Sequence, residues 1–311
     1  MKNYIILAFL IISTGLMAQK ADSVKKNITT DSLFNLMNSD NKKERVAIFE
    51  SSRLILSQTT ETVKKKNLNF LVLHRFGDLA GPMGGGKYFF GLDNIADLYI
   101  GFEYGVTDNL NIDIGRSSTP KAGGLVDMEL KYAILHQTRN DSSPLAITLI
   151  GETGLRPYNS YPHFNDRVSY FAQAIFARRF SHNFSLQVAP SIVQNNQPIP
   201  DVTGNPKELF SLSASAVIKV TNLMGIVVDY AHPFSSLRNG SAGFSDPLGF
   251  GFQVVTGGHV FTLNITNAKA ITEINYLSNT SSDYFRGQYR LGFTISRTFD
   301  FNHKESYKPK K

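Results

Sequence analysis

The sequence predicts an all-β protein that forms a closed antiparallel up-and-down transmembrane β-barrel of about 12 strands. Three observations support this prediction: apolar residues recur with a period of two, the alternating stretches are long, and short and long connections follow one another along the chain. Successive side chains of a strand point to opposite faces, so a period of two gives each strand one apolar face and one polar face. In a barrel that spans a membrane, the apolar face meets lipid and the polar face lines the lumen.

The stretch GLVDMELKYAIL, residues 124–135, shows the alternation clearly. Asp127, Glu129 and Lys131 stand two apart, with apolar residues between them. A helix would spread these charges around its circumference, whereas a strand places them on one face. The closing stretch QYRLGFTISRTFDF alternates in the same way.

Candidate strands begin near residue 67 and recur to residue 301. Most of them approach the roughly 9 to 11 residues that a tilted transmembrane strand needs, whereas strands of globular proteins average about 5 to 6. The candidates are 67–77, 94–104, 109–116, 124–136, 144–154, 168–179, 183–193, 208–220, 223–231, 247–256, 259–267 and 288–301.

The connections between these stretches alternate in length. GVTDN, FSHN, TN and TGG are short, and the connections on either side of each are long; only the pair that flanks 124–136 is balanced. Outer-membrane barrels have short periplasmic turns on one rim and long external loops on the other. A β-sandwich has no reason to sort its loops in this way.

The N-terminal 66 residues do not follow the pattern. Residues 1–18 have the layout of a secretory signal peptide, with one Lys, an apolar run and a small residue at the expected cleavage position. We expect residues 19–66 to form a periplasmic segment or a partial plug, with a short amphipathic helix near TDSLFNLMNSD. Residues 67–302 are predicted to form the barrel, and residues 303–311 a basic tail.

Composition excludes several classes of protein. After residue 19 no apolar run approaches the roughly 20 residues of a membrane-spanning helix. The chain has no cysteine, which excludes disulfides, thiol chemistry and a lipoprotein anchor. Although the formal charge is +7, an exported chain does not meet nucleic acid, so the basic runs are expected to be solvated or to lie near anionic lipid headgroups.

The charged residues on the polar faces are the candidate lumen-lining residues. They carry both signs, which is consistent either with an interior that satisfies its own charges or with a path for ions or solutes. They are Asp97, Glu103, Asp113, Asp127, Glu129, Lys131, Glu152 and Arg290. Glu50 and Arg53, three residues apart, are predicted to bring a salt-bridged polar cluster into the periplasmic mouth.

The seven histidines lack the spacing of a metal site, so no metal or cofactor is predicted. His259, in TGGHVF, is the one candidate for chemistry at the rim, since some barrel enzymes place Ser, His and an acid on the outer wall. No GxSxG motif accompanies it, and a His after two glycines is more often a turn residue. No catalytic residue is therefore predicted.

The stretches IFESSRLI, LHRFG, YFFGLD, EYGVTDNL, IGRSS and TGGHVF, together with the closing strand, resemble a family of uncharacterised secreted or outer-membrane proteins of Gram-negative bacteria, described as a domain of unknown function. The resemblance covers about residues 46–301 and implies a β-barrel without assigning an activity. Gly292, Ile295, Phe299 and Phe301 resemble the terminal signal that the barrel-assembly machinery reads, although Arg297 stands where that signal has a hydrophobe.

The leading functional hypothesis is a non-enzymatic outer-membrane barrel with a role in passage, binding or surface display. Its expected partners are outer-membrane lipid, the barrel-assembly machinery and a small-molecule ligand that the sequence does not identify. One alternative is a barrel-wall enzyme that acts on lipid or glycolipid. A second alternative is a soluble secreted β-sandwich or carrier, which the strand lengths and the loop pattern disfavour.

Overall fold

The computed structural model describes residues 44–118, 124–157, 163–196, 207–235 and 243–301. The predicted leader at 1–18, the predicted helix at 30–40 and the basic tail at 303–311 lie outside these residues. No helix of the described residues is both long and apolar enough to cross a bilayer.

Twelve strands form the wall of a closed barrel, as the sequence predicts. Each strand lies within a few residues of its predicted stretch. The strands are β1 (Asn67–Phe76), β2 (Ile95–Gly105), β3 (Leu110–Ser117), β4 (Leu125–Leu135), β5 (Ala146–Leu155), β6 (Val168–Arg179), β7 (Phe184–Gln194), β8 (Glu208–Lys219), β9 (Met224–Phe234), β10 (Leu248–Thr256), β11 (His259–Thr266) and β12 (Arg290–Asp300).

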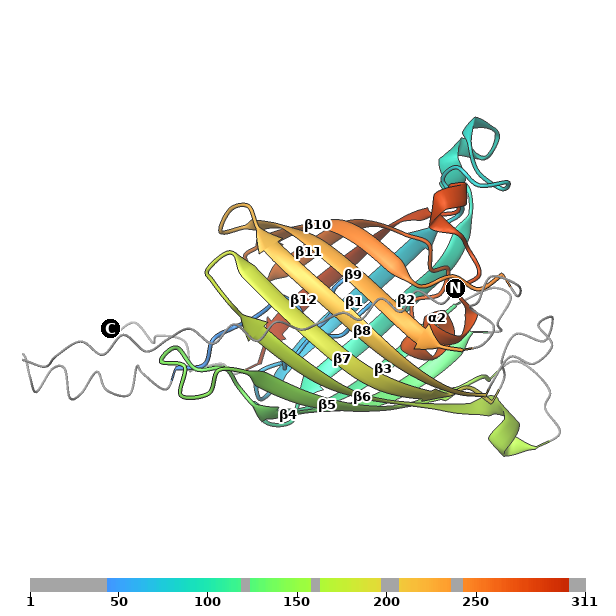
Figure 1. Cartoon of the computed structure of the whole chain (residues 1–311). Coiled ribbons are helices and arrows are strands. Elements are labelled where there is room, and N and C mark those ends of the chain that lie inside the picture. The colour runs from blue at the N-terminus through green and yellow to red at the C-terminus, as the bar shows by residue number, and fades with distance from the viewer. Residues whose placement is uncertain (1–43, 119–123, 158–162, 197–206, 236–242, 302–311) are drawn as a thin grey trace, which may run out of the picture. The chain divides into compact units, whose positions relative to one another are not determined.

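Every strand pairs antiparallel with its neighbours in sequence, and β1 pairs with β12 to close the ring (Figure 1). Asn67 lies opposite Asp300 in this closing pair, so the barrel begins and ends at the same rim. Closure leaves no strand edge unpaired, which a bilayer requires because lipid offers no hydrogen bonds to backbone groups.

The alternation in the sequence gives the wall two faces. On β4, Met128, Leu130 and Tyr132 point outward and are about half exposed, whereas Asp127 and Glu129 point inward and are buried. The other strands also carry large apolar residues outside, but the inward faces of β5, β6, β7 and β9 carry buried apolar residues as well as polar ones. An apolar exterior of this kind is suited to contact with lipid tails.

The connections sort by rim, which confirms the predicted pattern (Figure 1). We call the rim with residues 106–109, 136–145, 180–183, 220–223 and 257–258 the short-turn rim. At the opposite rim, which we call the long-loop rim, the chain connects β1 to β2, β3 to β4, β5 to β6, β7 to β8, β9 to β10 and β11 to β12. In the tightest turn Gly258 has φ 91°, a conformation that glycine adopts without strain.

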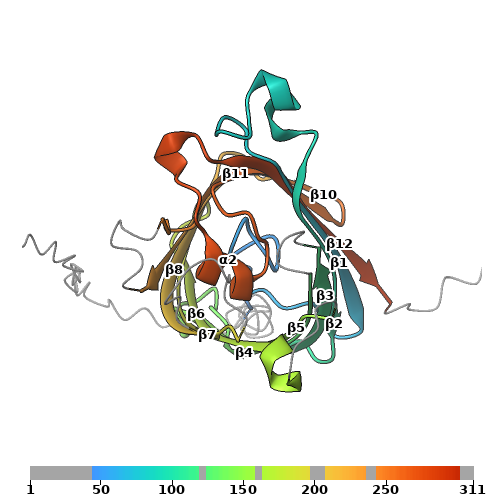
Figure 2. The same cartoon turned by 90° about the vertical axis from the view of Figure 1, so that its right-hand side faces the viewer.

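Two segments fold into the ring of strands (Figure 2). The first, residues 44–66, precedes β1 and is called the inner hairpin. The second, residues 267–289, joins β11 to β12 and is called the inner loop. Its helix α2 (Glu273–Asn279) lies inside the ring, whereas none of the residues of its short 3₁₀ helix η5 (Tyr284–Arg286) is buried. Two more 3₁₀ helices, η2 (Gly86–Gly91) and η3 (Phe164–Arg167), lie in long loops.

Residues 267–289 correct one expectation. The loop pattern of the sequence predicts that this segment is a long external loop, but the α2 residues from Glu273 to Ser278 are buried. The reason is apolar content: Ile271, Ile274, Tyr276 and Leu277 are covered when the segment packs inside the barrel.

Candidate functional site: the filled lumen

The inner hairpin enters and leaves the barrel at the short-turn rim. The Val46 amide donates to the Gln137 carbonyl at 2.9 Å, next to β4, and the Lys66 amide donates to the Gly105 carbonyl at 2.8 Å, at the end of β2. Between these points the chain reverses in a tight turn, in which the Leu54 amide donates to the Ser57 carbonyl at 2.9 Å. The hairpin therefore has both of its ends at one rim.

The tip of the hairpin is held by Asp229 of β9. One carboxylate oxygen, Oδ2, accepts hydrogen bonds from three successive amides: Ile55 at 2.9 Å, Leu56 at 2.7 Å and Ser57 at 3.2 Å. Asp229 is fully buried on the inward face of β9. Amides of a tight turn that point to one site form a concave anion-binding nest, and the wall supplies the anion here.

The base of the hairpin has its own carboxylate. Glu61 Oε1 accepts hydrogen bonds from the Ile48 amide at 2.8 Å and the Phe49 amide at 3.2 Å, which ties the two arms together. Burial raises the pKa of Glu61, and the two amide hydrogen bonds partly oppose that rise.

The inner loop enters from the long-loop rim and meets the hairpin inside the wall. Arg75 of β1 contacts both segments: its Nη2 donates to the Ile55 carbonyl at 2.9 Å, and its Nη1 donates to the carbonyls of Ala268 and Ala270. Asp97 of β2 accepts the Ile271 amide at 2.9 Å. An ion pair of 3.1 Å between Arg53 of the hairpin and Glu273 of α2 joins the two segments directly.

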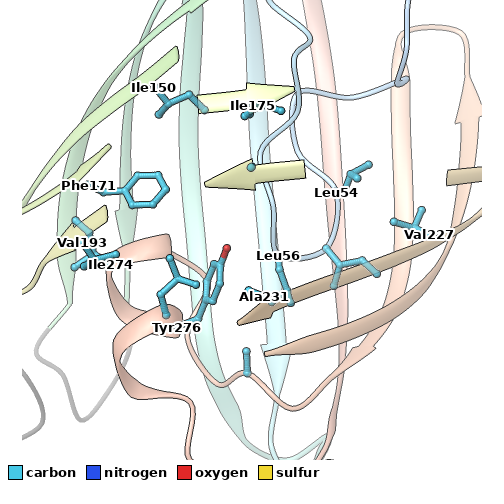
Figure 3. Close-up of a cluster of buried hydrophobic side chains, with 14 of the residues drawn as sticks. Leu54, Leu56, Ile150, Phe171, Ile175, Val193, Val227, Ala231, Ile274 and Tyr276 are labelled. Carbon is cyan, nitrogen blue, oxygen red and sulfur yellow. The ribbon is translucent and has the colours of Figure 1, made fainter. Parts of the chain in front are cut away.

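An apolar cluster fills one side of the lumen (Figure 3). Leu54 and Leu56 of the hairpin and Ile274 and Tyr276 of α2 converge there on wall residues from β5, β6, β7 and β9. The labelled wall residues are Ile150, Phe171, Ile175, Val193, Val227 and Ala231. Each large apolar side chain that leaves water on packing contributes roughly 1.5 to 3 kcal/mol, so the cluster holds both segments in place.

All eight lumen-lining candidates point inward and are buried. Asp97 and Arg290 lie toward the long-loop rim, where Arg290 pairs with Asp78 and donates to the Asn267 carbonyl at 2.7 Å. Lys131 lies toward the short-turn rim, and its ammonium donates to the Ser52 carbonyl and to Gln58 Oε1, each at 3.2 Å.

Four of the candidates form one row across adjacent strands. Glu103, Asp113, Glu129 and Glu152 are mutual register partners on β2, β3, β4 and β5, and we call them the carboxylate row. Asp127 lies one step away on β4 and accepts the Tyr99 hydroxyl at 2.8 Å. The row faces the polar side of the hairpin, whose Ser52 and Gln58 side chains donate to Glu103 and Glu129.

Glu50 and Arg53 do not form the shared cluster that their spacing suggests. Glu50 pairs with Lys219 at the end of β8, whereas Arg53 pairs with Glu273 of α2. The hairpin forms bends at residues 50–52 and an isolated bridge between Arg53 and Gln58 rather than a helix, so residues three apart in sequence do not share a helical face here.

His259 opens β11 at the short-turn rim. Its ring contacts the Arg297 guanidinium, with Nδ1 to Nη1 at 3.0 Å, and stacks on Phe261. In the described part of the chain no serine hydroxyl or carboxylate is hydrogen-bonded to this ring, and no three His, Asp or Glu side chains are grouped to hold a metal ion.

Sequence reasoning missed several residues that hold the lumen together. Asp229 and Arg75 occupy inward positions of alternating strands, so the sequence pattern predicts that their side chains point into the lumen. Their hydrogen-bond partners, however, come from segments distant in sequence. Tyr99, Arg156 and Glu273 were also missed; Arg156 binds Asn275 Oδ1 of α2 at 2.7 Å.

The wall and the hairpin tip together match one known family. The model of the membrane bound beta barrel domain (DUF5777) matches residues 49–299. The chain belongs to this family. The match begins within the inner hairpin, so the family includes the hairpin tip as well as the wall, and it confirms the resemblance found in the sequence. No curated protein matches the chain significantly.

Several solved structures are similar in fold. The KdgM porin is 5% identical over 75% of this chain and 99% of its own, with a TM-score of 0.44. Omp33 of Acinetobacter baumannii is 8% identical over 76% and 99%, with a TM-score of 0.43. An outer membrane channel from Pseudomonas putida F1 is 10% identical over 77% and 98%, with a TM-score of 0.44. Likenesses this remote carry no argument about function.

Proposed function

We propose that this membrane-bound barrel lies in the outer membrane, exported with residues 1–18 as its leader and inserted by the barrel-assembly machinery. The short-turn rim then faces the periplasm, and the long loops face outward. The sorted connections support this orientation, as does the start of β1 and end of β12 at the short-turn rim.

The proposed role is that of a non-enzymatic channel closed by the inner hairpin. The observation that carries it is the way the hairpin is inserted: it enters and leaves at the same rim, and its tip is held by the Asp229 carboxylate. A segment inserted in this way can withdraw toward the periplasm without breaking any pairing between the 12 strands.

The contacts of His259 favour the channel over a barrel-wall enzyme. Both nitrogens of its ring lie within hydrogen-bond distance of Arg297 Nη1, and in the described residues no serine hydroxyl is hydrogen-bonded to the ring. An assay of purified protein against lipid esters, with His259→Ala as the control, tests this directly. Ester hydrolysis that disappears in the variant would support the enzyme instead.

Planar-bilayer recording tests the plug. Deletion of residues 22–62 removes most of the hairpin, and deletion of residues 22–43 is the matched control that keeps it. We expect larger or more frequent conductance steps from the first variant only. Unchanged conductance after removal of the hairpin would refute its role as the plug.

A further inference from the structure

We infer that the acidic wall of the lumen is a binding site for small cationic solutes that carry a guanidinium or amino group, and that Arg53 of the inner hairpin occupies this site when the channel is closed. The inference rests on the proposed function, because it names the class of solute that the channel would accept. It is carried by three features around Arg53.

The first feature is the immediate surroundings of the Arg53 guanidinium. It is buried, with Nη2 3.1 Å from Glu273 Oε2, and it lies over the ring of Tyr99 at 5.4 Å from the centroid. Asp127, Glu129 and Glu152 are close enough to act on it electrostatically. An aromatic face together with several carboxylates is the chemistry that recognises guanidinium and ammonium groups.

The second feature is the space that the wall leaves for the Tyr99 ring, on which the Arg53 guanidinium lies. Gly101 and Gly115 are register partners on β2 and β3, and the Tyr99 ring lies over both of them. A Cβ atom at Gly115 would lie 2.0 Å from the Tyr99 hydroxyl oxygen, so a larger residue there would displace the ring. The wall is thus shaped to hold the ring that covers the cation.

The third feature is an excess of carboxylate oxygens over donors. Neither carboxylate oxygen of Glu152 has a hydrogen-bond donor in the described part of the chain, although this residue is 95% covered, whereas the side chains of its row neighbours Asp113 and Glu129 are hydrogen-bonded to each other. The amide of Asn111, two residues before Asp113, is fully buried and likewise has no partner there.

Nearby cations act on Glu152 electrostatically but donate no hydrogen bond to its oxygens in the described residues. Lys131 is hydrogen-bonded to the hairpin, at the Ser52 carbonyl and Gln58 Oε1, and Arg53 is paired with Glu273. Buried carboxylates are costly unless a cation or a donor approaches them. The wall therefore has capacity for more positive charge than the hairpin brings, and withdrawal of Arg53 would increase that capacity.

Chemical rescue in the full chain tests the inference. Arg53→Ala empties the site, and methylguanidinium is offered with methylurea as its neutral isostere. We expect methylguanidinium to raise the midpoint of thermal unfolding of R53A by about 3–6 °C at a concentration tenfold above its Kd. Wild type, in which Arg53 occupies the position of the guanidinium group, should respond less than R53A does, and neither protein should respond to methylurea.

A second variant assigns the binding to the acidic wall. R53A/E129Q/E152Q removes two of its carboxylates and should lose the response to methylguanidinium. Equal responses of wild type and R53A, or of R53A and the triple variant, would overturn the inference. An equal response to methylurea would do so as well.

The inference also survives a variant that does not fold. If R53A does not fold, as judged by gel migration that is the same before and after boiling, refolding in the presence of methylguanidinium should restore the folded protein. Failure to restore it would count against the site. This binding test is independent of conductance, so a plug without a cation site and a cation site without a plug give different results.

Discussion

The substitution Asp229→Ala should free the inner hairpin, because one carboxylate oxygen holds the three amides of Ile55, Leu56 and Ser57. A hydrogen bond to a charged group contributes roughly 1.5 to 3 kcal/mol. These three share one acceptor and are not additive, so we take about 3 to 6 kcal/mol for the set. At about 1.4 kcal/mol per factor of ten, the population of withdrawn hairpin rises roughly 10²- to 10⁴-fold.

The absence of cysteine from the chain provides a clean assay. Ser57→Cys places a single thiol at the hairpin tip, where the native side chain is 2% exposed. Maleimide labelling of the folded protein in bilayers then follows the withdrawn population, provided that docking is faster than labelling. Asp229→Asn keeps an acceptor but loses the charge, so it should accelerate labelling less than Asp229→Ala does.

The control is Ser213→Ala, which removes another buried polar group of the lumen wall, one with no hydrogen-bond partner in the described residues. Labelling of the introduced thiol should keep its wild-type rate when this substitution is added. Equal labelling rates with and without Asp229→Ala would refute the argument that Asp229 holds the hairpin.

Three further predictions concern the parts around this hairpin. Gly115→Ala should lower the free energy of unfolding in urea by roughly 1 to 3 kcal/mol, because the added Cβ atom meets the Tyr99 ring. The control is Gly151→Ala, where the added Cβ atom meets no atom within 4 Å and the urea midpoint should not change. Equal effects of the two substitutions would contradict the packing argument. Arg290→Ala removes the ion-pair partner of Asp78 and should lower the free energy of unfolding by about 3 to 5 kcal/mol in the same assay. Arg286→Ala breaks only an exposed ion pair and should have a much smaller effect. An Arg290→Ala variant as stable as the wild type would contradict this prediction. Because burial raises the pKa of Glu61, protonation of Glu61 stabilises the docked hairpin; this stabilisation is complete below the ordinary Glu pKa and is lost as pH rises through the raised pKa. Labelling of the thiol introduced by Ser57→Cys should therefore accelerate over that pH range. Glu61→Gln should remove the acceleration.

The wall of the barrel was predictable because its information is local. A period of two sets the direction of each side chain, and connection length sets the rim, so Asp127, Glu129 and Lys131 could be placed inside from their spacing alone. Each strand also pairs with its neighbour in sequence, and no long-range choice of partner is needed to order the sheet.

The contents of the lumen were not predictable in the same way. The contact between Arg53 and Glu273 joins residues 220 positions apart, and no periodicity specifies it. The position of the inner loop between β11 and β12 is readable from the sequence, whereas its inward direction depends on apolar residues finding cover inside the wall. To predict the carboxylate row, one must know the register between neighbouring strands as well as the direction of each side chain, and this register is seen only once the strands are paired.

Hydrogen exchange of the hairpin amides in the intact protein, reconstituted in bilayers, tests the central claim most directly. If the inner hairpin is docked in the lumen and its tip amides are bound to Asp229, the amides of Ile55, Leu56 and Ser57 should exchange as slowly as amides within the strands. Exchange as fast as that of the exposed turn at 220–223 would contradict a lumen closed by this segment.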